Sequence, residues 1–174
     1  MERSRHGLDN FEQVVAEHRQ MVFRTAVGFV HCPEDAEDIT QEVFLKAWKS
    51  WGSFRGEAAV ATWLYRIAVN LSINYAAYKK RRAHFSTEEI PLSPVEKEDD
   101  PQRLLERDET QAAVRDAIDS LPDRQRVAFV LSRYDDLSQR EVAAVMKLSE
   151  GAVEQLLQRA RINLQQKLKN IVGK

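Results

Sequence analysis

Acidic side chains are concentrated in the stretch DAEDITQEVF, residues 35–44. Carboxylates at this density can serve acid–base catalysis, hold a metal ion in a helical bundle, or attract a basic protein surface. The stretch supplies no nucleophile for catalysis, and no His in the chain follows an Asp or Glu by three residues, as a di-metal bundle requires. The pattern therefore favours a surface that docks a basic protein, and a solvated acidic helix face is the plain alternative.

Aromatic and basic side chains are interleaved further along, between Phe44 and Phe85, where nine of the 14 aromatic residues fall. Aromatic faces can stack unpaired nucleobases while neighbouring cations hold the phosphates. About half of these rings are expected simply to fill a small core. The candidates for nucleic-acid contact are Phe54, Arg55, Trp63, Arg66, Asn70, Asn74 and the first bases of KKRR, Lys79 and Lys80.

Two helix-start signals follow each other in the last third of the chain. Ser138 and Glu141 have the spacing of a capping box, and Ser149 repeats the signal before a second helix. A short helix over 138–146, a tight turn and a longer helix are typical of a helix-turn-helix, although an αα-hairpin that binds nothing has the same pattern. Gln can read adenine and Arg can read guanine or phosphate. The candidate DNA-reading residues are Gln139, Arg140, Glu154, Gln155, Gln158 and Arg159.

Apolar residues recur with helical periodicity, so the candidate groups are expected to lie on helices. No strand-like alternation of useful length occurs. Pro33 can open a helix whose apolar stripe is Ala36, Ile39, Val43 and Ala47, and a second helix is expected over 61–82. Pro122 opens a helix that precedes the helix-turn-helix. Residues 86–108 contain three prolines and eight acids against three bases, which is typical of a flexible linker. We therefore predict an all-α protein with two small helical domains, 8–85 and 109–170, joined by an acidic linker.

The bulk composition limits the function classes. Lys plus Arg is 26 and Asp plus Glu is 27, a formal net charge of −1, which argues against a general polyanion binder. The single cysteine, Cys32, excludes an intrachain disulfide and fits a reducing compartment, and no second Cys–His pair completes a zinc site with His31. With neither a signal-peptide core nor a long apolar run, a cytoplasmic protein is expected.

The order of the motifs resembles one family. DAEDITQEVFLKAW, SFRGEAAVATWLYRIAVN, an acidic linker, LPDRQRVAFVL and LSQREVAAVMKLSEGAVEQLLQRAR are similar to the extracytoplasmic-function (group IV) sigma factors of bacteria, over about residues 11–168. The family keeps the second and fourth conserved sigma regions. The resemblance implies a non-catalytic promoter-specificity subunit, often in stress responses, that binds core RNA polymerase and promoter DNA.

The resemblance also implies residue roles. Docking on the polymerase β′ clamp helices would fall to Asp35, Asp38, Gln41, Glu42 and Phe44. The segment from Phe54 to Asn74, with Trp63, Tyr65, Arg66 and Asn70, would melt the minus-ten element and capture a flipped base. The helix-turn-helix would read the minus-thirty-five duplex, and the β flap would be a further contact on the polymerase.

Other partners follow from the same resemblance: an anti-sigma factor is expected, but no cofactor, metal, small-molecule substrate or membrane insertion. Glu154 and Leu156 depart from the family, whose members often carry bases there. Two alternatives remain. A free-standing helix-turn-helix regulator would bind an operator without polymerase, and a metal-dependent hydrolase would use the acids of the first domain.

Overall fold

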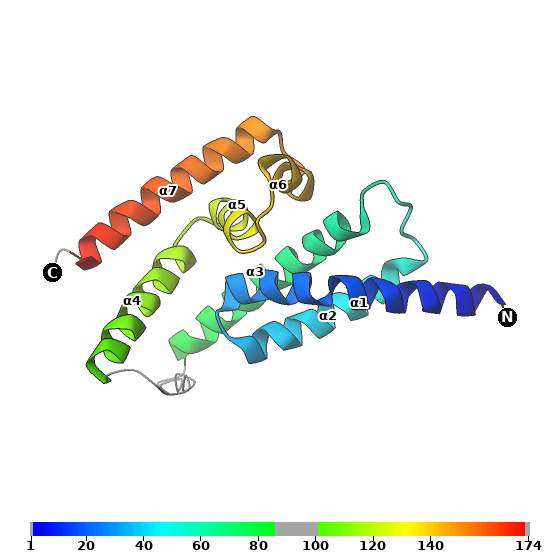
Figure 1. The fold of residues 1–174 in the computed structure, drawn as a ribbon, viewed down its shortest axis with the longest axis horizontal. Coiled ribbons are helices and arrows are strands. Elements are labelled where there is room, and N and C mark those ends of the chain that lie inside the picture. Colours follow the sequence, from blue (N-terminus) through cyan, green and yellow to red (C-terminus); the bar gives the residue numbers. More distant parts are fainter. Residues whose placement is uncertain (1, 86–100, 173–174) are drawn as a thin grey trace.

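The chain folds into seven helices, with no strand, in the residues that the computed structural model describes, 2–85 and 101–172 (Figure 1). The helices are α1 (Glu2–Val30), α2 (Pro33–Trp51), α3 (Val60–Phe85), α4 (Pro101–Asp119), α5 (Asp123–Arg133), α6 (Gln139–Met146) and α7 (Glu150–Val172). The all-α prediction is confirmed. The first three helices form one half of the molecule and the last four form the other.

The core of the first half is built on the apolar stripe that was expected in α2. Ala36, Ile39, Val43 and Ala47 are all buried there. Val22 and Ala26 of α1 and Leu64 and Ala68 of α3 meet this stripe in one cluster. Pro33 occupies the first turn of α2, where its missing N–H forfeits no helical hydrogen bond. The carboxylates of Glu34 and Asp35 stabilise the helix by interacting with the positive end of its dipole. This packing fixes which face of α2 points to solvent.

The second half is held together by α7, which packs along α4, α5 and α6. The first helix of the second half, α4, begins at Pro101. It therefore lies partly within the segment, up to residue 108, that was expected to be a linker. Proline is well suited to the first helical position, and the acidic side chains that follow it do not prevent helix formation. Residues 86–100 of the expected linker lie outside the described residues.

The helix-turn-helix forms as expected. Ser138 caps α6 by accepting a hydrogen bond from the Glu141 N–H, and the Glu141 side chain accepts one from the Ser138 N–H, which completes the capping box. Lys147 takes a left-handed conformation with a φ of 55° and ends α6. Ser149 then caps α7 through the Ala152 N–H. Val142 of α6 and Val153 of α7 are buried between the two helices.

Replacing Ser138 by alanine should destabilise the second half by about 1 kcal/mol, because the first turn of α6 loses the side-chain acceptor of its capping box. Urea denaturation followed by circular dichroism measures this as a lower unfolding midpoint. Gln166→Ala, at an exposed position of α7, is the control and should leave the midpoint unchanged. Equal midpoints for both variants would argue against a stabilising role of the capping box.

The two halves pack against each other. Phe29 of α1 and Tyr65 and Val69 of α3 share a buried cluster with Val127, Val130 and Leu131 of α5 and with Val142 of α6. Gly28 allows the close approach of α1 and α5, because a Cβ built on it would lie 2.6 Å from a methyl carbon of Val130. Within the first half it is α3 that lies beside α6 of the helix-turn-helix (Figure 1).

Candidate protein and nucleic-acid interfaces

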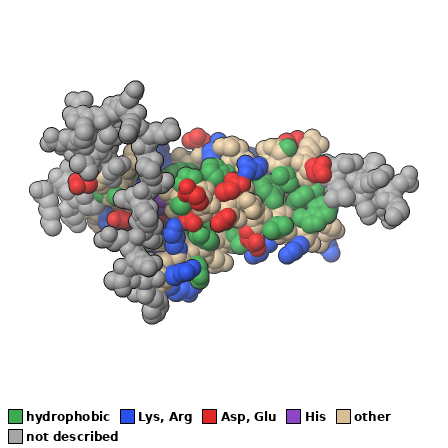
Figure 2. Space-filling model, turned by 90° about the horizontal axis from the view of Figure 1, so that it is seen from below, with side chains coloured by type: hydrophobic (Ala, Val, Ile, Leu, Met, Phe, Trp, Pro, Cys, Tyr) green, Lys and Arg blue, Asp and Glu red, His purple; other side chains and the backbone are tan. Residues whose placement is uncertain are grey.

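An acidic and apolar surface covers the solvent side of α2. Asp38, Gln41 and Glu42 are exposed, and Leu45 and Trp48 continue the same helical face at 54% and 42% exposure. Figure 2, which views the molecule from below, shows acidic side chains gathered beside exposed hydrophobic ones. A face of this kind offers apolar contact area together with negative charge, which suits a basic protein partner. We call these five residues the α2 face.

Two residues expected at the docking surface have other positions. Phe44 is buried in the cluster that joins α1, α2 and α3, so it supports the α2 face from beneath and does not form part of it. Asp35 accepts a hydrogen bond of 2.7 Å from the Tyr75 hydroxyl and pairs with Lys79, both on α3. Burial raises the pKa of Asp35, but its bonds to Lys79 and Tyr75 outweigh burial and the net pKa is lowered. Asp35 therefore joins α2 to α3.

Lys79 is correspondingly not a free cation, since its ammonium group is held by Asp35. The hydrogen bond to Asp35 also raises the pKa of Tyr75 to about 12. Lys80, the next residue of KKRR, remains exposed. Of the two lysines expected to contact nucleic acid, Lys80 is the exposed one, and it forms no ion pair with any other side chain in the part of the chain that the structure describes.

Two aromatic rings, Phe54 and Trp63, line a small cavity at the turn between α2 and α3, and Trp51 stacks on Phe54. Trp51 and Phe54 stack at 5.7 Å between ring centroids with an interplanar angle of 7°, and Phe54 lies 4.8 Å from the Trp63 ring. The cavity has a volume of about 200 Å³ and is lined by Ser50, Ser53, Phe54, Arg55, Glu57, Ala58, Trp63 and Arg66. Aromatic faces with hydroxyl and guanidinium groups at the rim can hold a planar heterocycle next to a phosphate. We call this site the ring cavity.

The candidate residues of α3, including Arg66 at the edge of the ring cavity, divide into exposed and covered groups. Asn70 and Asn74 are exposed, as is Lys80. Tyr65 is buried against the second half, and burial raises the pKa of its phenol. Arg66 donates hydrogen bonds to the carbonyls of Ala144 and Val145 in α6, at 2.7 and 3.2 Å. Two of the expected nucleic-acid residues thus contact the helix-turn-helix in this arrangement.

The candidate DNA-reading surface of the helix-turn-helix is open. Gln139 and Arg140 at the start of α6 are exposed, and so are Glu154, Gln155, Gln158 and Arg159 of α7. Leu156 of α7 is half-buried and packs against the apolar cluster that joins the two halves, which explains its apolar side chain. This surface places one acid among amides and a guanidinium at the N-terminal half of α7, the part of such a helix that meets base edges.

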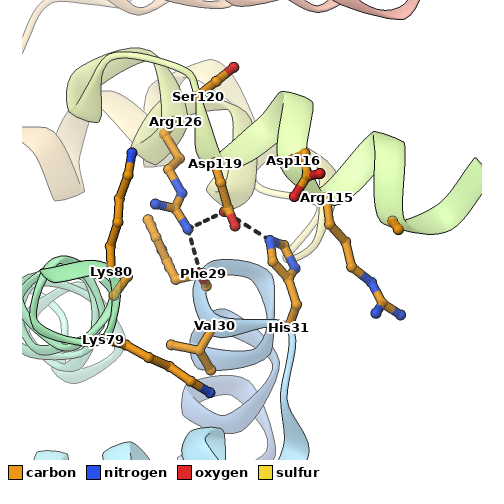
Figure 3. Close-up of a pocket in the computed structure, with 12 residues that line it drawn as sticks. Phe29, Val30, His31, Lys79, Lys80, Arg115, Asp116, Asp119, Ser120 and Arg126 are labelled. Carbon is orange, nitrogen blue, oxygen red and sulfur yellow. Dashed lines mark hydrogen bonds and ion pairs between the residues drawn. The ribbon is translucent and has the colours of Figure 1, made fainter. Parts of the chain in front are cut away.

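Polar contacts between the halves include residues that the sequence did not single out. Arg126 of α5 is buried, donates to the Phe29 carbonyl and to Asp119 at the end of α4, and lies 5.4 Å from the Phe29 ring. His31, at the turn after α1, lies 3.0 Å from the same Asp119 carboxylate (Figure 3). These residues line a cavity of about 580 Å³ where the halves meet. Their spacings in sequence follow no local motif, so only the tertiary structure identifies them.

No group of three or more His, Cys, Asp and Glu able to hold a metal ion occurs in the part of the chain that the structure describes. None of the helices, within those same residues, combines the length and apolarity needed to cross a bilayer.

The models of Sigma-70 region 2 and Sigma-70 region 4 match residues 14–82 and 111–164. The RNA polymerase sigma-H factor of Pseudomonas aeruginosa is 35% identical over 161 residues, covering 87% of this chain and 82% of that protein. The ECF RNA polymerase sigma-E factor of Escherichia coli is 37% identical over 145 residues, covering 79% and 76%.

Solved structures agree with the fold. CnrH in complex with the cytosolic domain of CnrY matches with a TM-score of 0.66 and 27% identity, over 92% of this chain and 88% of that one. The sigma factor RpoE of Bartonella quintana, solved with the anti-sigma factor NepR, matches with a TM-score of 0.63 at 22% identity, over 92% and 97%. The second match, at that identity, concerns the fold alone.

Proposed function

The chain belongs to the sigma-70 family of RNA polymerase sigma factors, in its extracytoplasmic-function group. On this basis we propose which of its surfaces binds each partner in transcription initiation. The α2 face docks core RNA polymerase on the β′ clamp helices. The ring cavity and the exposed side of α3 bind the minus-ten element, and the helix-turn-helix reads the minus-thirty-five duplex. The chain acts by binding and performs no catalysis of its own.

One observation carries this proposal: the α2 face and the ring cavity share no residue. The carboxylates of Asp38 and Glu42 would repel DNA phosphates, whereas Arg55 and Lys80 would attract them. A sigma factor must hold a protein and a nucleic acid at the same time, and separating the two charges makes that possible. A free-standing operator-binding regulator has no need for the α2 face.

Promoter melting is proposed to draw on binding energy alone. Extruding a base from a duplex costs a few kcal/mol, and stacking on aromatic faces offsets this by contributing about 1–3 kcal/mol per base. Phe54 and Trp63 supply such faces at the ring cavity, with Arg55 beside them for a phosphate. Asn70 and Asn74 are exposed on α3 and can donate to and accept from base edges.

Reading of the minus-thirty-five duplex is proposed for the exposed side of α7. Gln155 and Gln158 suit adenine, and Arg159 suits guanine or phosphate. Glu154 can accept a hydrogen bond from the amino group of cytosine, so its presence predicts a cytosine preference in place of the phosphate contact that a base at this position would make.

An anti-sigma factor is a further proposed partner, supported by the similarity to CnrH, whose structure contains the cytosolic domain of CnrY. The half-exposed apolar residues of the α2 face are available to such an inhibitor as well as to polymerase. An inhibitor bound there would compete directly with core enzyme. We propose the cytoplasm as the site of action, because core polymerase and promoters are found there.

Asn70→Ala should reduce promoter opening several-fold while leaving polymerase binding unchanged, because the amide lies on α3, away from the α2 face, and would contact only the melted strand. Permanganate reactivity of unpaired thymines in the minus-ten region measures opening, and co-elution with core enzyme measures binding. Asn10→Ala, at an exposed position of α1, is the matched control. Equal permanganate reactivity for Asn70→Ala and Asn10→Ala would remove Asn70 from the minus-ten surface.

A further inference from the structure

A carboxyl group is buried in the contact between the two halves. Asp135 follows α5, and its side chain is 0% exposed. One oxygen, Oδ2, lies 2.8 Å from the Thr25 hydroxyl of α1, and the other, Oδ1, has no hydrogen-bond partner among the residues that the structure describes. The nearest cation is Arg24, whose Nε lies 3.7 Å from Oδ1, beyond hydrogen-bond distance, on a side chain that is 53% exposed.

This environment suits the neutral acid better than the carboxylate. The Thr25 hydroxyl has a single proton and lies within reach of two oxygens, Oδ2 of Asp135 and the Met21 carbonyl at 3.0 Å. An ionised Asp135 therefore receives at most one hydrogen bond for two buried oxygens. A protonated Asp135 donates its own proton to Thr25, and Thr25 donates to Met21, so both short contacts are satisfied.

The surrounding charges point the same way. Burial, with a smaller contribution from the neighbouring Asp136, raises the pKa of Asp135 to about 6 against the lowering effects of Thr25 and Arg24. The other titratable group facing it is the Tyr65 phenol of α3, whose own pKa is raised by burial and then by Asp135, with Glu141 of α6 adding to the rise. Arg24 is thus the one cation that these interactions place against Asp135.

We propose that the contact between the two halves is proton-linked: Asp135 takes up a proton when the halves close and releases it when they part. Separating the halves returns the carboxyl to water, where its affinity for a proton is ordinary. Acid therefore favours the closed arrangement and higher pH favours the open one.

The direction and size of the pH effect on closure follow from the pKa of Asp135 in the closed and open arrangements. Since the pKa of Asp135 is raised in the closed state, the stabilisation of closure is complete below the ordinary value of 3.8 and is lost as the pH rises through about 6. Between pH 7 and pH 5 the equilibrium constant for closing should increase about tenfold. Closure engages Tyr65 and Arg66 with the second half, so proton-linked closure would affect promoter binding. This consequence rests on the proposed function.

Fluorescence energy transfer between the halves tests the proposal in the full chain, without DNA or polymerase. Dyes attached through Lys49→Cys on α2 and Gln166→Cys on α7, in a Cys32→Ser background, report the distance between the halves. Titration from pH 7.5 to 5 should raise transfer efficiency. The same titration in a Gly28→Ala background, where contact with Val130 weakens closure, keeps the equilibrium within the measurable range.

Asp135→Asn is expected to remove the part of the pH response that Asp135 carries, because the amide donates to Thr25 at every pH, and Asp136→Asn, an identical change at an exposed neighbour, should retain the full response. Arg24→Gln, at an exposed side chain that tolerates exchange, should move the transition to higher pH, since its charge lowers the pKa of Asp135. A full pH response in Asp135→Asn, an unchanged transition in Arg24→Gln, or no response in either background would overturn the proposal. None of these outcomes bears on promoter or polymerase binding, which separate assays measure.

Discussion

Asp38→Lys is expected to weaken binding to core RNA polymerase by about 30- to 100-fold, or about 2–3 kcal/mol, at moderate salt. Asp38 is exposed at the N-terminal end of the α2 face, one helical turn from Glu42. Lysine there replaces an attraction with a repulsion against the basic surface that this face is proposed to meet. The fold should be unaffected, because the side chain takes no part in the core.

Fluorescence anisotropy of labelled chain titrated with core enzyme measures the loss. Glu109→Lys makes the same charge change on α4, far from α2, and should bind as the wild type does. Raising the salt concentration should narrow the difference between wild type and Asp38→Lys, because exposed charges are screened. If Asp38→Lys and Glu109→Lys bind core enzyme equally well, the α2 face is not the docking surface.

Gly28→Val is expected to shift the closed–open equilibrium of the two halves toward the open form by about 5- to 150-fold, the usual 1–3 kcal/mol for overpacking a tight contact. The glycine is buried between α1 and α5, where even a Cβ would lie 2.6 Å from a Val130 methyl carbon and 3.3 Å from the Tyr134 ring. Neither helix can absorb a branched side chain at that point without moving apart.

Small-angle X-ray scattering should show a larger radius of gyration for Gly28→Val, with helicity by circular dichroism unchanged. Gly151→Val is the matched control, because a Cβ at Gly151 meets nothing within 4 Å. An unchanged radius of gyration in Gly28→Val, with both halves folded, would mean that the halves do not depend on this contact.

The sequence was most informative where the determinants are local. The α2 stripe of Ala36, Ile39 and Val43 follows helical periodicity, and all of it is buried. The capping box of Ser138 and Glu141 is also a short-range pattern, and it forms. Both signals lie within a few residues of the atoms they position, so no knowledge of the tertiary structure is needed to read them.

The sequence was least informative where distant segments meet. Phe44 and Tyr65 have the residue types of contact surfaces, yet one fills the core and the other is covered by the second half. Asp135 and Thr25 are 110 positions apart, and no periodicity links them. The start of α4 at Pro101 was missed because an acidic, proline-containing segment is also the composition of a linker.

The most direct test of the central claim is gel filtration of the chain with bacterial core RNA polymerase at moderate salt. We expect co-elution at a stoichiometry near one to one, and loss of co-elution with Asp38→Lys. A chain that stays folded and monomeric but elutes apart from core enzyme would contradict the assignment of a polymerase-bound specificity subunit.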